Sequence, residues 1–368
     1  MTSIRLTGRS RLLRGAILLL ILPVGCIDNP ATTQPPDPFV SEYQLLWELF
    51  DTEYVGFQVK GIDWGQVRAE YADAAADVSS MEEMIGLAQS MLAELEDRHV
   101  ELIGPEGDTL PSWDPGYFVN ADPAVLMGYL EPCGFVWMQP EVWGFCLAGP
   151  DSIPYFLVTE WDGSFNTSLL DNVLEPLLDS PGLILDVRLC EEGTEGAVDN
   201  VVRRFVDQVR IGHLLQERTD PGTHDLSDPT PCLLHPRSWG FDAPVALLTG
   251  EANSGAGEVF ACDMAELPQV ALIGDTTRGS GDWPAVAWGL PEGWTVTCPE
   301  RTVLRPDSSY IEGDGVPPDI VVESASADFE NGFDPVLEYA FAWLGAQPPE
   351  PGPDRGAAQS SEVSTRTY

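Results

Sequence analysis

Lysine is almost missing from this chain of 368 residues, which contains only Lys60. Basic residues number 18 against 59 acidic ones, and the formal net charge is −41. A protein that binds DNA or RNA needs basic patches, and an anionic membrane surface would repel this chain. The composition therefore argues against a nucleic-acid partner, and we interpret the acidic excess as a solvated surface.

Long apolar runs are also missing from the start of the chain. The stretch Ala16–Leu22 is too short to span a membrane, and it follows a positively charged region. Residues 1–26 are therefore predicted to be an export signal. Its end, Leu22-Pro23-Val24-Gly25-Cys26, resembles a bacterial lipoprotein processing site. We favour a lipid anchor on Cys26 over ordinary cleavage, which predicts an exported protein of the bacterial periplasm or cell envelope.

No spacing of cysteine and histidine resembles a metal site, and neither a metal nor a cofactor is predicted. Six cysteines remain besides Cys26, and an exported chain lies in a compartment that permits disulfides. They are Cys133, Cys146, Cys190, Cys232, Cys262 and Cys298. The even number fits up to three bridges, and Cys133–Cys146 is the expected pair because it spans a possible hairpin.

Composition and periodicity divide the rest of the chain into segments. A tether rich in Pro and Thr covers residues 27–38, and a helical domain covers 39–100, where Ser80-Met81-Glu82-Glu83 has the pattern of a capping box. Short strands are expected over 101–158 and an α/β core over 159–345. The Pro-rich end, 346–368, is disordered by composition.

The centre of that core is a strand that turns sharply into a helix. Val245–Leu248 has the composition of a buried strand, a Gly-containing turn follows, and a helix is expected from about Glu258. A second buried strand, Val270–Ile273, ends in Gly274–Gly279. Such a turn exposes backbone N–H groups at the helix start, where an oxyanion is held and a nucleophile is often placed.

Four motifs in this order resemble those of the tail-specific (C-terminal processing) serine proteases, in the tricorn-like branch. They are Leu185–Arg188, Gly255-Ala256-Gly257-Glu258, Gly274–Gly279 and Tyr310–Asp319, and the resemblance covers Phe39 to Leu344. It implies an α/β (α+β) fold with a ClpP/crotonase-like core of strand–strand–helix units, preceded by a small helical domain. It also implies a peptide or unfolded-protein substrate. The chain leaves too little room for the PDZ domain that many relatives insert.

The same resemblance assigns roles to individual residues. His99, in Asp97-Arg98-His99, takes the place of the general base, and Glu312 the place of a further catalytic group. Gly193 falls where the family contributes an oxyanion N–H. The other three histidines, His213, His224 and His235, are expected to face solvent.

Three departures from the family pattern concern the chemistry. The family's nucleophilic serine falls on Gly255, while Ser254 lies one position earlier. The lysine that many members use as a base falls on Ser280, and Lys60 is expected to stay outside the site, so a Ser–Lys dyad is excluded. Glu192 replaces a glycine beside the oxyanion site, where a carboxylate would oppose developing negative charge.

Two hypotheses follow. The first is a serine endopeptidase that uses Ser254, His99 and Glu312, which requires the turn to shift by one residue. The second is a pseudoprotease that keeps the fold and its cleft but has lost hydrolysis. The position of the Ser254 hydroxyl distinguishes them, because a nucleophile must lie within about 3.5 Å of His99.

Overall fold

The computed structural model describes residues 38–149, 152–161, 163–191, 193–220 and 222–345. Its largest sheet has seven strands in the order β14-β10-β9-β6-β5-β4-β3. Pairing is parallel from β14 to β5 and antiparallel from β5 to β3. The strands are β3 (Val136–Gln139), β4 (Trp143–Ala148), β5 (Ile153–Val158), β6 (Leu183–Asp186), β9 (Val245–Thr249), β10 (Val270–Gly274) and β14 (Ile320–Val321).

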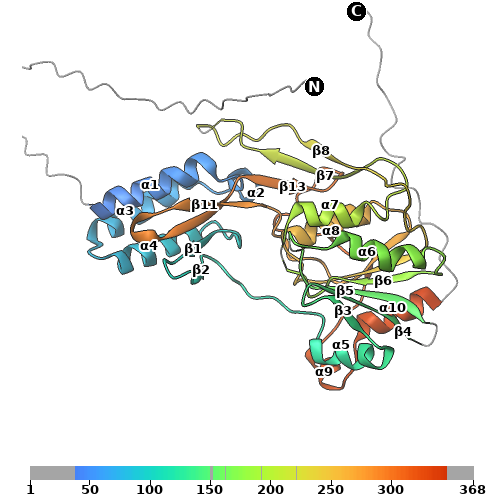
Figure 1. The fold of residues 1–368 in the computed structure, drawn as a ribbon. Coiled ribbons are helices and arrows are strands. Elements are labelled where there is room, and N and C mark those ends of the chain that lie inside the picture. The colour runs from blue at the N-terminus through green and yellow to red at the C-terminus, as the bar shows by residue number, and fades with distance from the viewer. Residues whose placement is uncertain (1–37, 150–151, 162, 192, 221, 346–368) are drawn as a thin grey trace, which may run out of the picture. The chain divides into compact units, whose positions relative to one another are not determined.

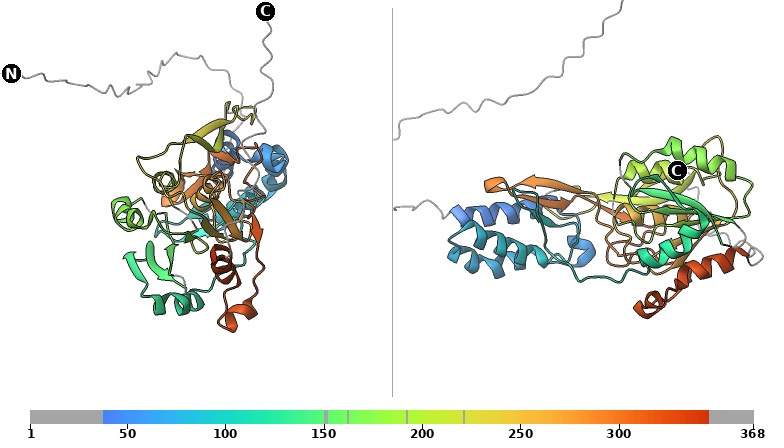
Figure 2. Two further views of the ribbon diagram at one scale, coloured as in Figure 1. Left: turned by 90° about the vertical axis from the view of Figure 1, so that its right-hand side faces the viewer. Right: turned by 60° about the horizontal axis from the view of Figure 1, so that its bottom comes forward.

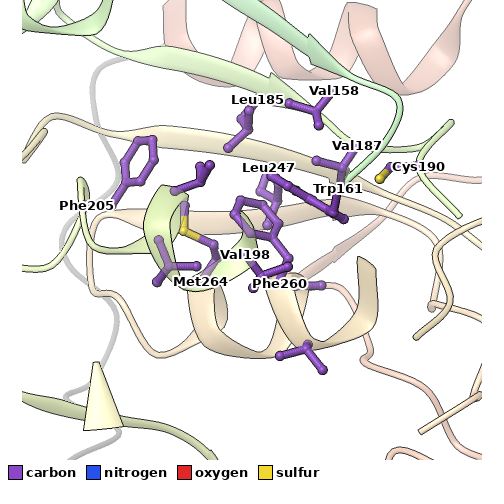
Figure 3. Packing of buried hydrophobic residues seen from close by; sticks show 14 of the residues in the cluster. Val158, Trp161, Leu185, Val187, Cys190, Val198, Phe205, Leu247, Phe260 and Met264 are labelled. Atoms are coloured by element: carbon purple, nitrogen blue, oxygen red, sulfur yellow. The ribbon is translucent and has the colours of Figure 1, made fainter. Parts of the chain in front are cut away.

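Helices cover both faces of this sheet (Figures 1 and 2). Along β9, Val245 and Leu247 join one hydrophobic cluster, whereas Ala246 and Leu248 join the other. The first cluster lies under α6 (Thr167–Leu174), α7 (Glu195–Val202) and α8 (Ala256–Ala265), and Figure 3 shows part of it. The second lies under α5 (Pro123–Leu130) and α10 (Pro335–Gly345), and α9 (Ser326–Glu330) precedes α10. Burial on both faces explains why the central strands β6 and β9 are runs of apolar residues that become polar only at their last positions, Asp186 and Thr249.

The N-terminal region contains α1 (Pro38–Glu53), α2 (Phe57–Lys60), α3 (Trp64–Asp77) and α4 (Met81–Ala93). α4 begins where the sequence predicts, because the Ser80 hydroxyl accepts a hydrogen bond from the Glu83 amide at 3.3 Å. The helices pack on a second sheet of order β11-β12-β1-β2. Its strands are β1 (Glu101–Ile103), β2 (Thr109–Pro111), β11 (Ala285–Gly289) and β12 (Thr295–Pro299). In Figure 1 the blue helices therefore lie beside orange strands from late in the chain. A mixed α/β fold with a helical N-terminal region is thus confirmed.

A third sheet has the order β13-β7-β8, formed by β7 (Arg210–Glu217), β8 (Thr230–Leu234) and β13 (Arg301–Leu304). The expectation that His213 faces solvent is wrong, because its side chain is buried in β7 with Nδ1 2.8 Å from Asp263 Oδ1. His224 is half-buried beside Asp51 at 2.9 Å, and His235 is exposed as expected. His213 and His224 each contact an aspartate that is distant in the sequence. The polarity of the neighbouring residues does not reveal such a contact.

Six cysteines lie in the described residues, all as free thiols. Cys133 lies just before β3 and Cys146 lies within β4, and the Cys133 thiol donates a hydrogen bond to the Tyr129 carbonyl at 3.3 Å. Burial, with Cys133 beside it, raises the pKa of Cys146 to about 12. The disulfide between them stays a prediction. Cys26, the leader, the tether as far as residue 37 and the C-terminal tail lie outside the described residues. No helix in the described part is long and apolar enough to cross a membrane.

Candidate active site

Gly255 lies at the sharp turn between β9 and α8. Its φ of 48° and ψ of −113° belong to a region that residues with a side chain rarely adopt. A Cβ atom built on Gly255 would lie 3.2 Å from His99 Nε2. The position that faces the predicted base is therefore Gly255, as the family alignment places it.

Ser254 is directed elsewhere. Its hydroxyl donates a hydrogen bond to the Glu191 carbonyl at 2.9 Å, and its amide donates to the same carbonyl at 3.1 Å. The side chain is thereby attached to the loop that follows β6. The structure brings Gly255 and His99 together, and it places the Ser254 hydroxyl on Glu191.

Trp283 closes the space on the other side of Gly255. A Cβ on Gly255 would lie 3.0 Å from Trp283 Cδ1 and 3.2 Å from its Nε1. Contacts this short require a neighbour to move by a few tenths of an ångström. Trp283 was not predicted as a site residue, because it follows the Gly274–Gly279 motif in a segment without periodicity.

His99 is buried at the end of the helical region and is held through its backbone. Its amide donates to Asp97 Oδ1 at 2.8 Å, and its carbonyl accepts from the Thr297 hydroxyl of β12 at 2.6 Å. Nδ1 lies 3.9 Å from Asp97 Oδ1. A carboxylate on the Nδ1 side and the Gly255 position on the Nε2 side form the arrangement that a general base requires.

Lys60 lies inside the site, contrary to the expectation from the sequence. Its ammonium is 2.6 Å from Glu312 Oε1 and 3.4 Å from Asp97 Oδ2, and it donates to the carbonyls of Leu95 and Glu96. The expectation failed because Lys60, at the end of α2, is distant in sequence from both carboxylates. Glu312, the further catalytic group expected from the resemblance, is thus bound to Lys60.

Three buried carboxylates, those of Asp97, Asp282 and Glu312, have oxygens within 4.8 Å of one another. Burial, with the neighbouring carboxylates, raises the pKa of Asp282 to about 7 and that of Glu312 well above its usual range. This group has the donors that a divalent cation prefers. The Lys60 ammonium already neutralises part of its charge, so the described geometry is that of a lysine–carboxylate cluster.

Glu258, in the first turn of α8, attaches this helix to the loop after β10. Its carboxylate accepts hydrogen bonds from the Thr277 hydroxyl at 2.6 Å and from the amides of Gly279 and Ser280, both at 2.7 Å. Complete burial raises its pKa to about 7, although these donors oppose the shift. Ser280, the position at which the resemblance implies a lysine in many members, is buried and donates its amide to this network.

The expected oxyanion residue Gly193 pairs with Trp161 in an isolated parallel bridge. A Cβ on Gly193 would overlap Trp161, so only glycine permits this approach. The preceding loop is held by Asn253, whose amide group donates to the carbonyls of Val187 and Cys190. Glu192, predicted to disturb the oxyanion site, lies outside the described residues.

A cavity of about 550 Å³ opens next to this cluster. Lys60 and Glu312 line it, together with Arg98, Tyr117 and Arg278. The Arg278 guanidinium lies 3.6 Å from the centre of the Tyr117 ring, and that of Arg98 lies 5.6 Å from it. Both cations are therefore fixed against one aromatic ring at the wall of the cavity.

Comparisons with known proteins agree with this architecture. The model of Peptidase family S41 matches residues 153–322, and that of the Tricorn protease C1 domain matches residues 35–93. Tricorn protease of Thermoplasma acidophilum is 28% identical over 163 residues, which cover 43% of this chain and 14% of that protein. The matched part is thus a small fraction of that curated relative.

Solved structures show the same fold. A putative peptidase from Parabacteroides merdae is 25% identical with a TM-score of 0.74, covering 84% of this chain and 97% of that one. The photosystem II D1 C-terminal processing protease is 16% identical with a TM-score of 0.51, over 78% of this chain and 94% of that one. Mature CPAF is 10% identical with a TM-score of 0.61, over 82% and 95%.

Proposed function

Because this chain belongs to the tail-specific, tricorn-like serine peptidases of family S41, we propose that it binds peptides in the cleft of that fold but lacks the nucleophile to cleave them. The observation that carries the proposal is the short approach of Gly255 to His99 Nε2. A serine peptidase needs a hydroxyl within hydrogen-bond reach of its base. Glycine offers no hydroxyl at this position, which faces His99 Nε2.

An active peptidase that uses Ser254 is the second candidate. This candidate is favoured because the contacts that hold His99 are present and because Ser254 immediately precedes Gly255 in the chain. It requires the turn to rotate and both hydrogen bonds to Glu191 to break. The turn is also closely packed at Gly257, where a Cβ would lie 3.0 Å from the Cys190 carbonyl oxygen, which leaves little room for the backbone to rotate. A misplacement on the order of 1 Å costs roughly a hundredfold in rate, so we expect little activity by this route.

Fluorophosphonate labelling of purified protein separates the two candidates. We expect no labelling of the wild type, because fluorophosphonates need an activated serine. Gly255→Ser should gain labelling, since its Cβ would point at His99 Nε2. Gly255→Ser with Trp283→Leu should label faster, because Trp283 crowds the new side chain.

Two controls decide the outcome. His99→Ala in the Gly255→Ser protein should abolish the gained labelling, which assigns the base. Ser254→Ala should leave it unchanged. If the wild type labels and Ser254→Ala removes the label, the protein is an active peptidase and the lost-nucleophile proposal is wrong.

We further propose that the protein is exported and lipid-anchored through Cys26. The arginines before Ala16–Leu22 and the cysteine that ends this leader support the proposal. A lipid anchor holds a protein to a membrane surface without a spanning helix. Peptides would then meet the cleft outside the cytoplasm.

A further inference from the structure

The cavity of about 550 Å³ beside the Lys60 cluster gathers positive charge in an otherwise acidic protein. Three of its lining residues, Lys60, Arg98 and Arg278, are basic, although the chain carries a net charge of −41. The Lys60 ammonium is already held by the carboxylates of Glu312 and Asp97. The two arginines are therefore the cations that face the cavity without a role in that cluster.

The cavity adjoins the place where a peptide would lie against His99. Arg98 directly precedes His99, and Arg278 belongs to the loop after β10. Glu251, in the turn between β9 and Gly255, also lines the cavity. Successive residues of an extended peptide advance by about 3.3 Å, and their side chains alternate in direction. A side chain within a few residues of the one at His99 can therefore enter this cavity.

Both guanidinium groups are held in place before any ligand arrives. They pack against the Tyr117 ring, and the Tyr117 hydroxyl donates a hydrogen bond to the Glu191 carboxylate. The Arg278 amide donates to the Asn253 carbonyl at 2.9 Å, and Arg98 lies between two buried residues. A site whose groups are already positioned loses little conformational entropy on binding.

The hydrogen-bonding capacity of the Arg278 side chain is not used up. Its Nε donates to the Glu251 carbonyl at 2.9 Å, but its guanidinium forms no ion pair with a carboxylate in the described part of the chain. Its Nη2 is buried and has no hydrogen-bond acceptor among the same residues. A buried charged donor without an acceptor is costly, so a carboxylate that reaches this side chain would be favourable.

Arg98 has one anionic partner, and the interaction is weak. Its Nη1 lies 3.2 Å from Asp114 Oδ1, but the Asp114 side chain is exposed, and ion pairs at exposed positions contribute little. Burial and the nearby charge of Arg278 lower the pKa of Arg98, so the two guanidinium groups repel each other. A carboxylate placed between them would be attracted by both.

Three further acidic residues line the cavity, and each is engaged elsewhere or exposed. The Glu251 carboxylate accepts a hydrogen bond from the Phe118 amide at 2.7 Å, and that of Glu94 accepts one from the Tyr71 hydroxyl at 2.9 Å. Glu94 and Glu96 are exposed, and water and salt screen charges in such positions. These carboxylates therefore leave the guanidinium pair available to an anionic group.

We propose that Arg98 and Arg278 form a subsite that binds the side-chain carboxylate of an aspartate or glutamate in a peptide lying along His99. This subsite rests on the proposed function, since it defines the kind of peptide that the cleft binds. A guanidinium presents parallel N–H donors that match the two oxygens of a carboxylate. Trp113, whose ring centre lies 5.6 Å from the Arg98 guanidinium, provides an apolar wall for the CH₂ groups of the ligand.

Selection of peptides by mRNA display tests this preference without assuming a sequence. The purified full chain is presented with random linear peptides, whose C-termini are blocked by the link to their RNA. We expect enrichment of Glu or Asp at one position with the wild type, and loss of that enrichment with Arg278→Met. Peptides enriched without an acidic position, or with a basic one, would overturn the subsite and leave peptide binding intact. If no peptide is enriched, the proposed peptide-binding function fails, and the subsite fails with it.

Calorimetry with a selected peptide measures the preference and identifies the source of the carboxylate. The amidated peptide with Glu should bind roughly tenfold to a hundredfold more tightly than the same peptide with Gln, because charge-assisted hydrogen bonds are stronger than neutral ones. A third peptide carries Gln and a free C-terminal carboxylate. If it binds as tightly as the Glu peptide, the site takes chain ends and the proposal is wrong.

Variants separate the subsite from a general loss of structure. Arg278→Met and Arg98→Met should each remove most of the preference for Glu, whereas the affinity for the Gln peptide should change by less than about threefold. Arg203→Met is the matched control, because it removes one positive charge outside the cavity and should keep the full preference. If one variant does not fold, the other decides. Full preference in a folded Arg278→Met or Arg98→Met protein would overturn the proposal.

Discussion

Lys60 is the residue on which the buried carboxylate cluster depends. Its ammonium contributes one positive charge beside the carboxylates of Asp97, Asp282 and Glu312, which are all buried. Lys60→Met would leave these carboxylates without a cation, and breaking a buried ion pair costs about 3–5 kcal/mol. We expect a loss of this order in the free energy of unfolding near neutral pH, measured by urea denaturation.

Acidification should reduce this loss, because the carboxyl groups then take up protons and no longer need the ammonium. Arg203→Met is the matched control. It also removes one positive charge, but its ion pair with Asp199 is solvent-exposed, and such pairs contribute about 0–1 kcal/mol. If both variants lose the same small amount of stability, the cluster does not depend on Lys60.

At the scale of the elements, α8 and the loop after β10 are attached through Glu258. Its pKa is raised by burial to about 7, from an unfolded value near 4.5. The native state therefore binds the proton more tightly, and its contribution to stability is complete below about pH 4.5 and is lost as the pH rises through 7. We expect the free energy of unfolding to fall by roughly 2–4 kcal/mol over this range on account of Glu258.

The comparison of Glu258→Gln with the wild type isolates this effect. Glutamine does not titrate, so its stability curve between about pH 5 and pH 8 should lack that part of the slope. The variant should be less stable at about pH 5, because its NH₂ group cannot accept a hydrogen bond from a backbone amide. Parallel curves for the two proteins would show that Glu258 is not the titrating group.

The helices and strands that could be predicted are those marked by residues close together in the sequence. The start of α4 at Ser80 and the strands at Val245 and Val270 follow from capping and apolar runs. The position of Gly255 against His99 followed from the family alignment. Lys60, Asp282 and Trp283 were not predicted, because their contacts join segments far apart in the chain.

For the whole molecule, the proposed anchor makes a prediction about where the protein is found. Expressed in a bacterium that processes lipoproteins, the full chain should sediment with membranes and incorporate labelled palmitate. Cys26→Ser should abolish the label and move the protein to the soluble fraction, since one thioether-linked lipid group provides the attachment. Cys133→Ser should remain with the membranes. An unlabelled wild type would exclude the anchor.

The four-stranded sheet has a consequence for the order in which the chain folds. The hydrophobic cluster of α1, α3 and α4 is completed by Val296 and Cys298 of β12, which is synthesised about 200 residues after α4 ends. At about 5–20 residues per second, the ribosome needs roughly 10–40 s to make that stretch. Contacts between such distant segments also slow folding. The helices can pack on one another early, but the part of their cluster that Val296 and Cys298 cover stays open until most of the protein has been made.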